Sequence, residues 1–392
     1  INNDKVSGDT HFGNGNTILL YYLLEIDNST FEKIKFIIEE KNGNSKISNS
    51  NKMNAFHFLS NFTYRAYLST FIPFNEKQKL NISKHENVYL PKYLEIIKEY
   101  INFLKEKGCE PDLENNIGQT PIMLALKNKN LEFAKLYIQI FKNEIDIKHI
   151  DNNGFNIFDY AFENGSSLTE SCIIFIKTLF DIYDKEIDKQ FLNMCTRYGR
   201  NALLNLCEDY ALHIYEKFYY LNKINSLDFI RCEIIEVSDF NNPSNKKKKK
   251  QKLIIPEGKQ KIIYEKSVKD FRKFIKDIFY PLIEEFIKRG CDINCHTLEK
   301  KFMNKNKDLQ KYKYFNNYGN IYPIMYLLAY PESDELIQLI EKYKININCS
   351  DLKNQTLLMY LLEVQKQIKN ISEQNYKKIF DYLFNSIWKS NC

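Results

Sequence analysis

Apolar residues recur along this chain at the spacing of amphipathic helices, and residues 108–140 show the pattern most clearly. Ile122, Ala125 and Leu126 fall at i, i+3 and i+4, so they share one face of a predicted helix. Residues 127–130 are polar and predict a short loop, and residues 131–140 predict a second helix. The pattern therefore predicts two helices joined by a short connection.

The residues before the first of these helices predict how it begins. Gly118 suits a tight turn that needs a positive φ. Thr120 can cap the free N–H groups of the helix, and Pro121 fits its first turn, where a missing N–H costs nothing. Ala125 is small, as close packing between helices requires.

Weaker copies of this unit recur along the chain. The residue that precedes the first helix of each copy marks the register: Thr17, Asn54, Thr120, Asn156, Asn201, Tyr322 and Thr356. The intervals between these marks are 37, 66, 36, 45, 121 and 34 residues. Three intervals are nearly equal and a fourth is about twice as long, so the chain is predicted to be a row of similar units with insertions.

The segment 108–140 resembles an ankyrin repeat, whose signature is a Gly-x-Thr-Pro-Leu-x-x-Ala turn and helix, a short loop and a second helix, at a period of about 33 residues. The turn at 290–294 (GCDIN) is similar to the one at 108–112 (GCEPD). The resemblance spans about residues 15–388. It implies a mainly all-α solenoid of about seven helix pairs with a free concave surface.

Three insertions interrupt the predicted array. Residues 62–92 lengthen a connection between helices, and residues 298–317 extend a hairpin tip. Residues 222–268 are predicted to hold a small β-hairpin, in which 229–237 pair with 252–256 and 261–264. The predicted domains are therefore N-terminal repeats at 1–221, this inserted basic loop, and C-terminal repeats at 269–392, where Pro281 is expected to kink a helix.

Composition limits the class of protein. The 392 residues exceed the size of a typical single core, which agrees with a linear array. No stretch of 18 apolar residues predicts a membrane span. The nine cysteines contain no Cys-x-x-Cys pair, which is typical of reduced thiols in an intracellular protein, cytoplasmic or nuclear. The first residue is Ile1, which suggests a fragment or a processed product.

No set of residues predicts catalysis. The six histidines are widely spread, and His57 is expected to bond neighbouring backbone in its repeat. Cys291, Cys295 and His296 have neither haem-attachment spacing nor a second ligand pair for zinc. Phosphate-binding loops, dinucleotide turns and nucleophile elbows are missing from the sequence. We therefore expect no catalytic residue, no cofactor and no metal, and the chain is not predicted to be an enzyme.

The expected function is a protein-binding scaffold that uses the concave face and the hairpin tips. The resemblance places the candidate partner contacts on the best-preserved repeat and on the tip that follows it. They are Asn115, Asn116, Lys127, Asn128, Lys129, Asp151, Asn152 and Asn153. The partners are expected to be other proteins, and the chain is expected to be a monomer.

A basic run in the 222–268 insertion leaves alternatives open. Its residues are Lys246, Lys247, Lys248, Lys249, Lys250 and Lys252. They favour a solvated loop, a nuclear-import peptide, or contact with nucleic-acid phosphates, in that order. A second alternative is that the array is a regulatory or targeting arm of a larger enzyme, such as a nuclear ADP-ribosyltransferase; this rests on analogy with similar arrays.

Overall fold

The computed structural model describes residues 9–24, 26, 29–71, 82–162, 170–195, 199–225, 235–237, 249–251, 269–270, 272–297, 321–329, 331–367 and 373–390. The tip insertion 298–317 lies outside them, as do Lys246–Lys248 and Lys252 of the basic run. The chain divides into two compact units, unit 1 (Ile1–Asn205) and unit 2 (Leu206–Cys392).

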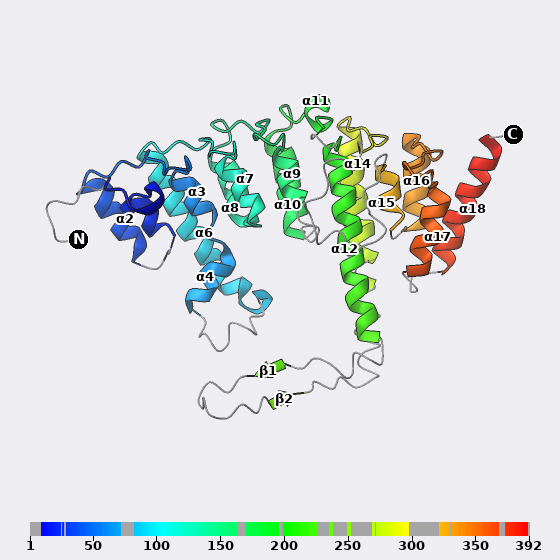
Figure 1. Cartoon of the computed structure of the whole chain (residues 1–392), viewed down its shortest axis with the longest axis horizontal. Helices are drawn as coiled ribbons and strands as arrows, with labels where there is room; N and C mark the ends of the chain where they lie inside the picture. The colour runs from blue at the N-terminus through cyan, green and yellow to red at the C-terminus, as the bar shows by residue number, and fades with distance from the viewer. Residues whose placement is uncertain are drawn as a thin grey trace. The chain divides into compact units, whose positions relative to one another are not determined.

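Unit 1 is a row of helix pairs (Figure 1). After a 3₁₀ turn at Gly13–Gly15 come α1 (Ile18–Tyr22), α2 (Thr30–Glu39), α3 (Ala55–Ser60), α4 (Tyr64–Phe71), α6 (Ile82–Glu106), α7 (Pro121–Lys127), α8 (Leu131–Ile140), α9 (Ile157–Phe162), α10 (Glu170–Ile182), α11 (Lys189–Leu192) and the start of α12 (Ala202–Asn225). The first helices of the pairs pack in the order α1, α3, α7, α9, and the second helices in the order α6, α8, α10. Each pair contacts its neighbours in the sequence, which is the packing of a solenoid.

Large aromatic side chains fill the layers between these pairs. Phe56 of α3 packs edge-to-face on Tyr137 and Phe141, with ring centroids 5.4 and 5.3 Å apart. Phe31 of α2 packs in the same way on Tyr100 and Phe103 of α6. These Phe and Tyr side chains are thus core residues that join successive pairs.

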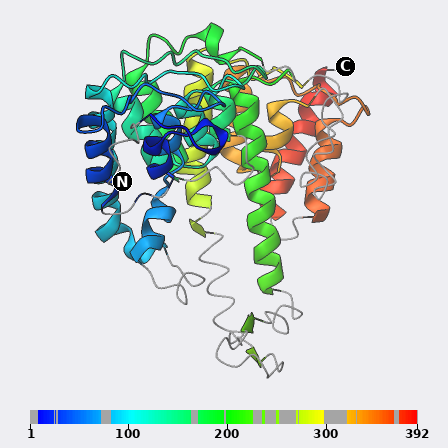
Figure 2. The same ribbon diagram turned by 60° about the vertical axis from the view of Figure 1, so that its left-hand side comes forward.

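Unit 2 continues the pattern with the remainder of α12, a π-helical turn (Ile275–Phe279), α14 (Tyr280–Lys288), α15 (Pro323–Leu327), α16 (Ser333–Tyr343), α17 (Leu357–Gln367) and α18 (Glu373–Ser390). Helices α14, α16 and α18 pack in sequence, as do α15 and α17. Figure 2 shows α17 and α18, at the red end of the colour bar, side by side. With α12 and α14 as one pair, the described residues hold seven helix pairs, and the predicted helical solenoid is confirmed.

Pro281 lies in the first turn of α14, directly after a π-helical turn. It has no N–H to donate to the carbonyl four residues earlier, and its ring crowds that carbonyl. The π-helical turn at Ile275–Phe279, directly before α14, is the wider turn that accommodates it.

The β-excursion is present, but its pairing differs from the predicted one. Strand β1 (Ile235–Val237) pairs antiparallel with β2 (Lys249–Gln251), in the register Ile235↔Gln251. Two lysines of the basic run are therefore strand residues rather than part of the loop. Pairing at 249–251 closes a shorter loop than the predicted pairing at 252–256, which lowers the entropy cost of closure slightly.

The prediction for Thr120 is wrong. Its backbone is extended, as before a helix, but its side chain makes no capping hydrogen bond. Pro121 sets the φ of the first turn and removes one unsatisfied N–H, so α7 begins without the cap. At the equivalent Thr17 the hydroxyl does accept a bond from the N–H of Leu20, at 3.4 Å.

No helix within the described ranges combines the length and apolar character needed to cross a bilayer.

Candidate functional site

Four hairpin tips share one turn built on a single Asn or Asp. The side-chain Oδ1 of Asn115 accepts hydrogen bonds from the N–H groups of Ile117 and Gln119, at 3.0 and 2.9 Å. The N–H of Asn115 in turn donates to the Gln119 carbonyl at 2.9 Å. The same bonds to the N–H groups two and four residues on are made at the other three tips, by Asn49, Asp151 and Asp351. A polar side chain that bonds its own turn makes each tip stiff.

In unit 1 the three tips of this kind, at Asn49, Asn115 and Asp151, and the turn at Gly13–Gly15 before them form a row of four tips that are hydrogen-bonded to one another. The N–H of Ser50 donates to the Asn14 carbonyl at 3.2 Å, that of Asn116 to Asn51 at 3.0 Å, and that of Asn152 to Ile117 at 3.1 Å. Side-chain amides add to this: Asn116 donates to the Ser50 carbonyl and Asn152 to the Asn116 carbonyl. We call the residues that link the tips the tip row: Asn14, Ser50, Asn51, Asn116, Ile117 and Asn152.

Gly118 is required for this close approach. Its φ is +78°, in the left-handed region, as the sequence predicts. A Cβ at this position would lie 2.7 Å from the backbone nitrogen of Asn152, in the next tip. A larger residue would therefore push two tips apart.

The structure separates the predicted contact residues into two groups. Asn116 and Asn152 are exposed in the tip row, and Asn115 and Asn153 are half-buried beside them. Lys127, Asn128 and Lys129 are exposed as well, but they lie at the C-terminal end of α7, whose last residue is Lys127. A seven-residue helix is about 10 Å long, so this second group lies at the far end of α7 from the tips.

Asp151 does not belong to an exposed surface. Its side chain is 4% exposed. One carboxylate oxygen accepts from the N–H groups of Asn153 and Phe155, both at 2.8 Å, and the other accepts from the Tyr160 hydroxyl at 2.7 Å. Asp351 has the same relation to Tyr360. Asp151 thus supports the tip from inside, and we remove it from the candidate contacts.

Two apolar side chains near the tips were not among the predicted contacts. Ile117 is 44% exposed between Asn116 and Gly118, and Ile150 is 40% exposed before Asp151. A β-branched apolar residue inside a polar turn sequence is the signal that could have identified Ile117. Exposed apolar and amide groups are therefore mixed along this edge of unit 1.

Buried polar residues hold the repeats beneath the tips together. The ring of His57 is fully buried, and its Nε2 lies 3.0 Å from the Gln119 carbonyl of the next repeat. That nitrogen donates, and Nδ1 accepts from the N–H of Asn54. Burial lowers the pKa of His57 to about 4, so the ring is neutral at neutral pH. The predicted structural role of His57 agrees with these contacts.

Asp159 occupies the same place in the fourth pair. Its carboxylate accepts from the N–H of Asn156 at 2.7 Å and from the Asn205 amide. Burial raises the pKa of Asp159 to about 7, against the lowering effect of these two hydrogen bonds. Asp159 and His57 therefore have the same structural role: each side chain joins the start of a first helix to the following repeat.

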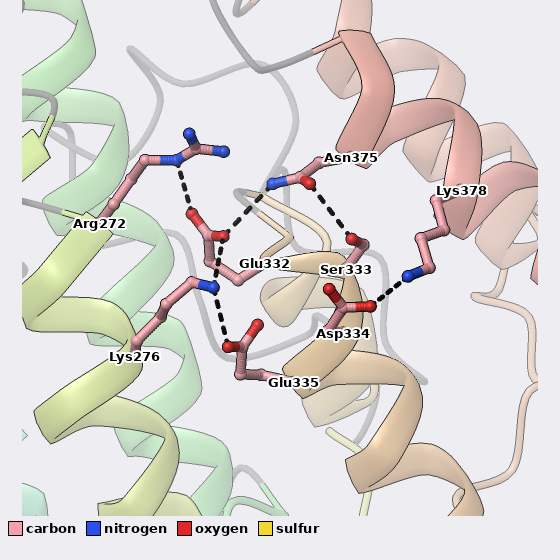
Figure 3. A network of polar contacts seen from close by, with 8 residues as sticks. All are labelled: Arg272, Lys276, Glu332, Ser333, Asp334, Glu335, Asn375 and Lys378. Atoms are coloured by element: carbon pink, nitrogen blue, oxygen red, sulfur yellow. Dashed lines mark hydrogen bonds and ion pairs between the residues drawn. The ribbon is translucent and has the colours of Figure 1, made fainter.

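Unit 2 has a polar network across its second helices (Figure 3). Glu332, directly before α16, is only 3% exposed, and its carboxylate accepts from Arg272 at 2.8 Å and from the Asn375 amide at 3.3 Å. Lys276 lies 3.7 Å from Glu332 and 2.9 Å from Glu335. Ser333 bonds Asn375, and Lys378 pairs with Asp334 at the exposed edge. The network joins three successive helix pairs.

These groups do not form a reactive centre. Among the described residues, no three His, Cys, Asp or Glu side chains are arranged to hold a metal ion. Burial raises the pKa of the Cys109 thiol to about 12 and that of Cys207 well above its usual value, so neither is a ready nucleophile. Cys291 is buried as well.

A family comparison agrees with the repeat geometry of unit 1. Residues 88–190 match the family of ankyrin repeats, in three copies. No curated protein matches the sequence. Among solved structures, the chain is similar to the ankyrin repeat domain of Bcl-3, a member of the IkappaB family, with 9% identity, a TM-score of 0.43, and coverage of 94% of this chain and 99% of that one.

Proposed function

We propose that this chain is a non-catalytic scaffold that binds partner proteins through the tip row of unit 1, since residues 88–190 match the family of ankyrin repeats. Ankyrin repeats are in general modules of protein–protein interaction. The observation that carries this proposal is the continuous hydrogen bonding from Asn14 to Asn152, which ties four successive tips together.

The physical support is preorganisation. Side chains on a surface that is already ordered lose less entropy on binding than side chains on loose loops. Asn116 and Asn152 present exposed amides, and Ile117 presents an exposed apolar group between them. Amide groups give directional hydrogen bonds and the isoleucine gives area that excludes water. This combination suits the surface of a folded protein.

Cross-linking mass spectrometry of the tagged chain in its native cells tests where partners bind. Lys52 is exposed next to Asn51 and reports on the tip row, and Lys177 is exposed on α10 and reports on the second helices. We expect partner cross-links to Lys52 and few to Lys177.

A pair of matched variants then tests the surface directly. Ile117→Glu changes an exposed tip side chain, and Ile174→Glu makes the same change on α10, where the side chain is 42% exposed. We expect Ile117→Glu to weaken capture of the cross-linked partner at least tenfold and Ile174→Glu to leave it unchanged. Equal capture by both variants would contradict the proposal.

A further inference from the structure

Unit 1 has a second edge at the far end of the first helices from the tips, where each first helix leads into the next helix. Two loops at this edge are joined directly, because the Asn128 amide donates to the side-chain oxygen of Asn61. Beneath them Asn130 is fully buried, and its amide donates to the carbonyls of Ser60 and Phe62, at 3.0 and 3.1 Å. The loops that follow α3 and α7 are therefore held side by side.

Helix α6 is tied to the same two loops. Tyr93 of α6 is fully buried, and its hydroxyl lies 2.7 Å from the Phe62 carbonyl and 3.0 Å from the side-chain oxygen of Asn130. Lys92 directly precedes Tyr93 and is exposed. The buried hydrogen bonds thus place Lys92 beside the two loops.

Three segments, 61–65, 91–95 and 127–132, meet over this buried polar network. They carry four exposed cations, which are Arg65, Lys92, Lys127 and Lys129. We call these four residues the loop edge. The acids of the same segments are Glu95 and half-buried Glu132, so the loop edge lies in a region with an excess of positive charge.

Three of these cations have no carboxylate partner among the described residues. Arg65, Lys92 and Lys127 form no ion pair there. Elsewhere in unit 1 such charges are often neutralised, as Lys105 is by Glu144 at 2.5 Å. The charges of the loop edge are therefore available to a ligand.

Helix stability does not account for the position of two of these cations. The N-terminal end of a helix carries a partial positive charge, so a cation there is unfavourable. Arg65 is the second residue of α4, and Lys129 lies two residues before α8. Both therefore raise the positive potential of the loop edge without stabilising the helix beside them, which indicates a role in binding rather than in folding.

We propose that the loop edge is a second docking surface of unit 1, which binds an acidic segment of a partner protein. The guanidinium of Arg65 can hold a carboxylate through two parallel hydrogen bonds, and the lysines supply further charge. Helices α3 and α7 pack on each other, so their loops are about 8–10 Å apart. This is roughly the length of three extended residues, so acids at every third position reach both loops.

The chemistry of the loop edge favours carboxylates over nucleic-acid phosphates. Proteins that bind single strands stack the bases on exposed aromatic rings. The three segments present no such ring, because Phe62, Tyr64 and Tyr93 are all buried. Duplex DNA is typically held by roughly 6–10 phosphate contacts, which is more than the cations of the loop edge supply.

Fluorescence anisotropy of a labelled peptide tests this surface on the full chain. The peptide has about twelve residues, with glutamate at every third position among glycine and serine. A second peptide has glutamine in place of each glutamate. We expect the chain to bind the glutamate peptide with an affinity that falls as salt is added, because exposed charges are screened. The glutamine peptide should bind at least tenfold more weakly.

Two double variants locate the binding. Arg65→Gln with Lys127→Gln should weaken binding of the glutamate peptide about fivefold, as expected for the loss of two exposed ion pairs. Lys98→Gln with Lys177→Gln is the matched control, because both lysines are exposed on the second helices α6 and α10 and the same charge is removed. This control should bind like the parent chain. Far-UV circular dichroism checks that both double variants are folded.

Several outcomes would overturn the proposal. An equal loss in the two double variants would show a response to net charge alone. A chain that binds neither peptide, or both equally well, would show that the loop edge does not recognise carboxylates. Single-stranded DNA of similar length that binds more tightly than the glutamate peptide, and is released by Arg65→Gln with Lys127→Gln, would assign the surface to nucleic acid. The tip row is tested separately by Ile117→Glu.

Discussion

At the scale of single residues, His57 and Asp159 show how one register position can have opposite electrostatic effects. Both are buried at the start of a first helix and both bond the following repeat. Burial lowers the pKa of the base and raises the pKa of the acid, because it disfavours the charged form of each. Their contributions to the pH dependence of stability therefore oppose each other.

For His57 the folded pKa is about 4 and the unfolded pKa about 6.5. Above pH 6.5 the ring is neutral in both the folded and the unfolded chain, so the contribution of His57 to the free energy of unfolding is intact. As the pH falls from 6.5 to 4, the unfolded chain binds a proton that the folded chain does not, and the free energy of unfolding decreases by up to about 3 kcal/mol. Asp159 acts in the other direction. As the pH rises from 3.8 to about 7, the unfolded chain loses a proton that the folded chain keeps, so the contribution of Asp159 to the free energy of unfolding is lost.

Comparison of His57→Asn with the parent chain isolates the histidine, because Asp159 is common to both. We expect the variant to be less stable at pH 7, since the bond to Gln119 is lost. The difference in free energy of unfolding between the variant and the parent chain should shrink as the pH falls from 6.5 to 4, because the parent loses stability over this range and Asn does not titrate. Urea unfolding at pH 7, 5.5 and 4.5 measures the deficit, and a constant deficit would mean that His57 titrates normally in the fold.

At the scale of elements, the network around α16 shows that burial decides how much an ion pair contributes to the free energy of unfolding. Arg272 and Lys378 both pair with acids at the start of this helix. Glu332, the partner of Arg272, is 3% exposed, whereas Asp334 and Lys378 are each more than half exposed. Solvent and salt screen the second pair and not the first.

We therefore expect Arg272→Met to lower the free energy of unfolding of unit 2 by about 2 kcal/mol, because it removes one of the partners of a buried carboxylate. Lys276 and Asn375 remain near Glu332, which keeps the loss below that of a fully unpaired charge. Lys378→Met should have no measurable effect. Urea titrations followed by Trp388 fluorescence compare the two, and equal losses would contradict a role for burial.

At the scale of the whole molecule, stability is a sum over neighbouring pairs, since each repeat buries its apolar surface on the next. Asn130 is an extreme case of such local coupling. It is fully buried, and its amide donates to the carbonyls of Ser60 and Phe62 while its oxygen accepts from Tyr93. These contacts join the second and third pairs of unit 1.

Asn130→Ala should destabilise unit 1 by about 3 kcal/mol, because two buried carbonyls lose a donor. Trp388 lies in α18 of unit 2, so its unfolding transition should move much less than the transition seen by far-UV circular dichroism. Asn128→Ala is the control, because Asn128 is exposed and its amide donates to the side-chain oxygen of Asn61 at the surface. A Trp388 transition that moves with the whole circular dichroism signal would show that the array unfolds as one unit.

Part of the fold could be predicted because it is encoded locally. Thr17, Asn54 and Thr120 mark helix starts through residues within a few positions of them, and Gly118 marks a positive φ through its own lack of a side chain. The tips could be located from the sequence, but the side-chain directions at the tips could not. Asn116 and Asp151 look equally polar, yet one is exposed and the other is enclosed by its own turn and by Tyr160.

The sequence by itself determined the repeat, its period and the positions of the helix pairs, because residues three or four apart share a helix face whatever lies around them. The tertiary structure alone decided the tip row and the network around Glu332. Each of these depends on residues from different repeats, such as Asn14 with Ser50 or Arg272 with Glu332, and the spacing of residues within one helix does not specify which of them meet.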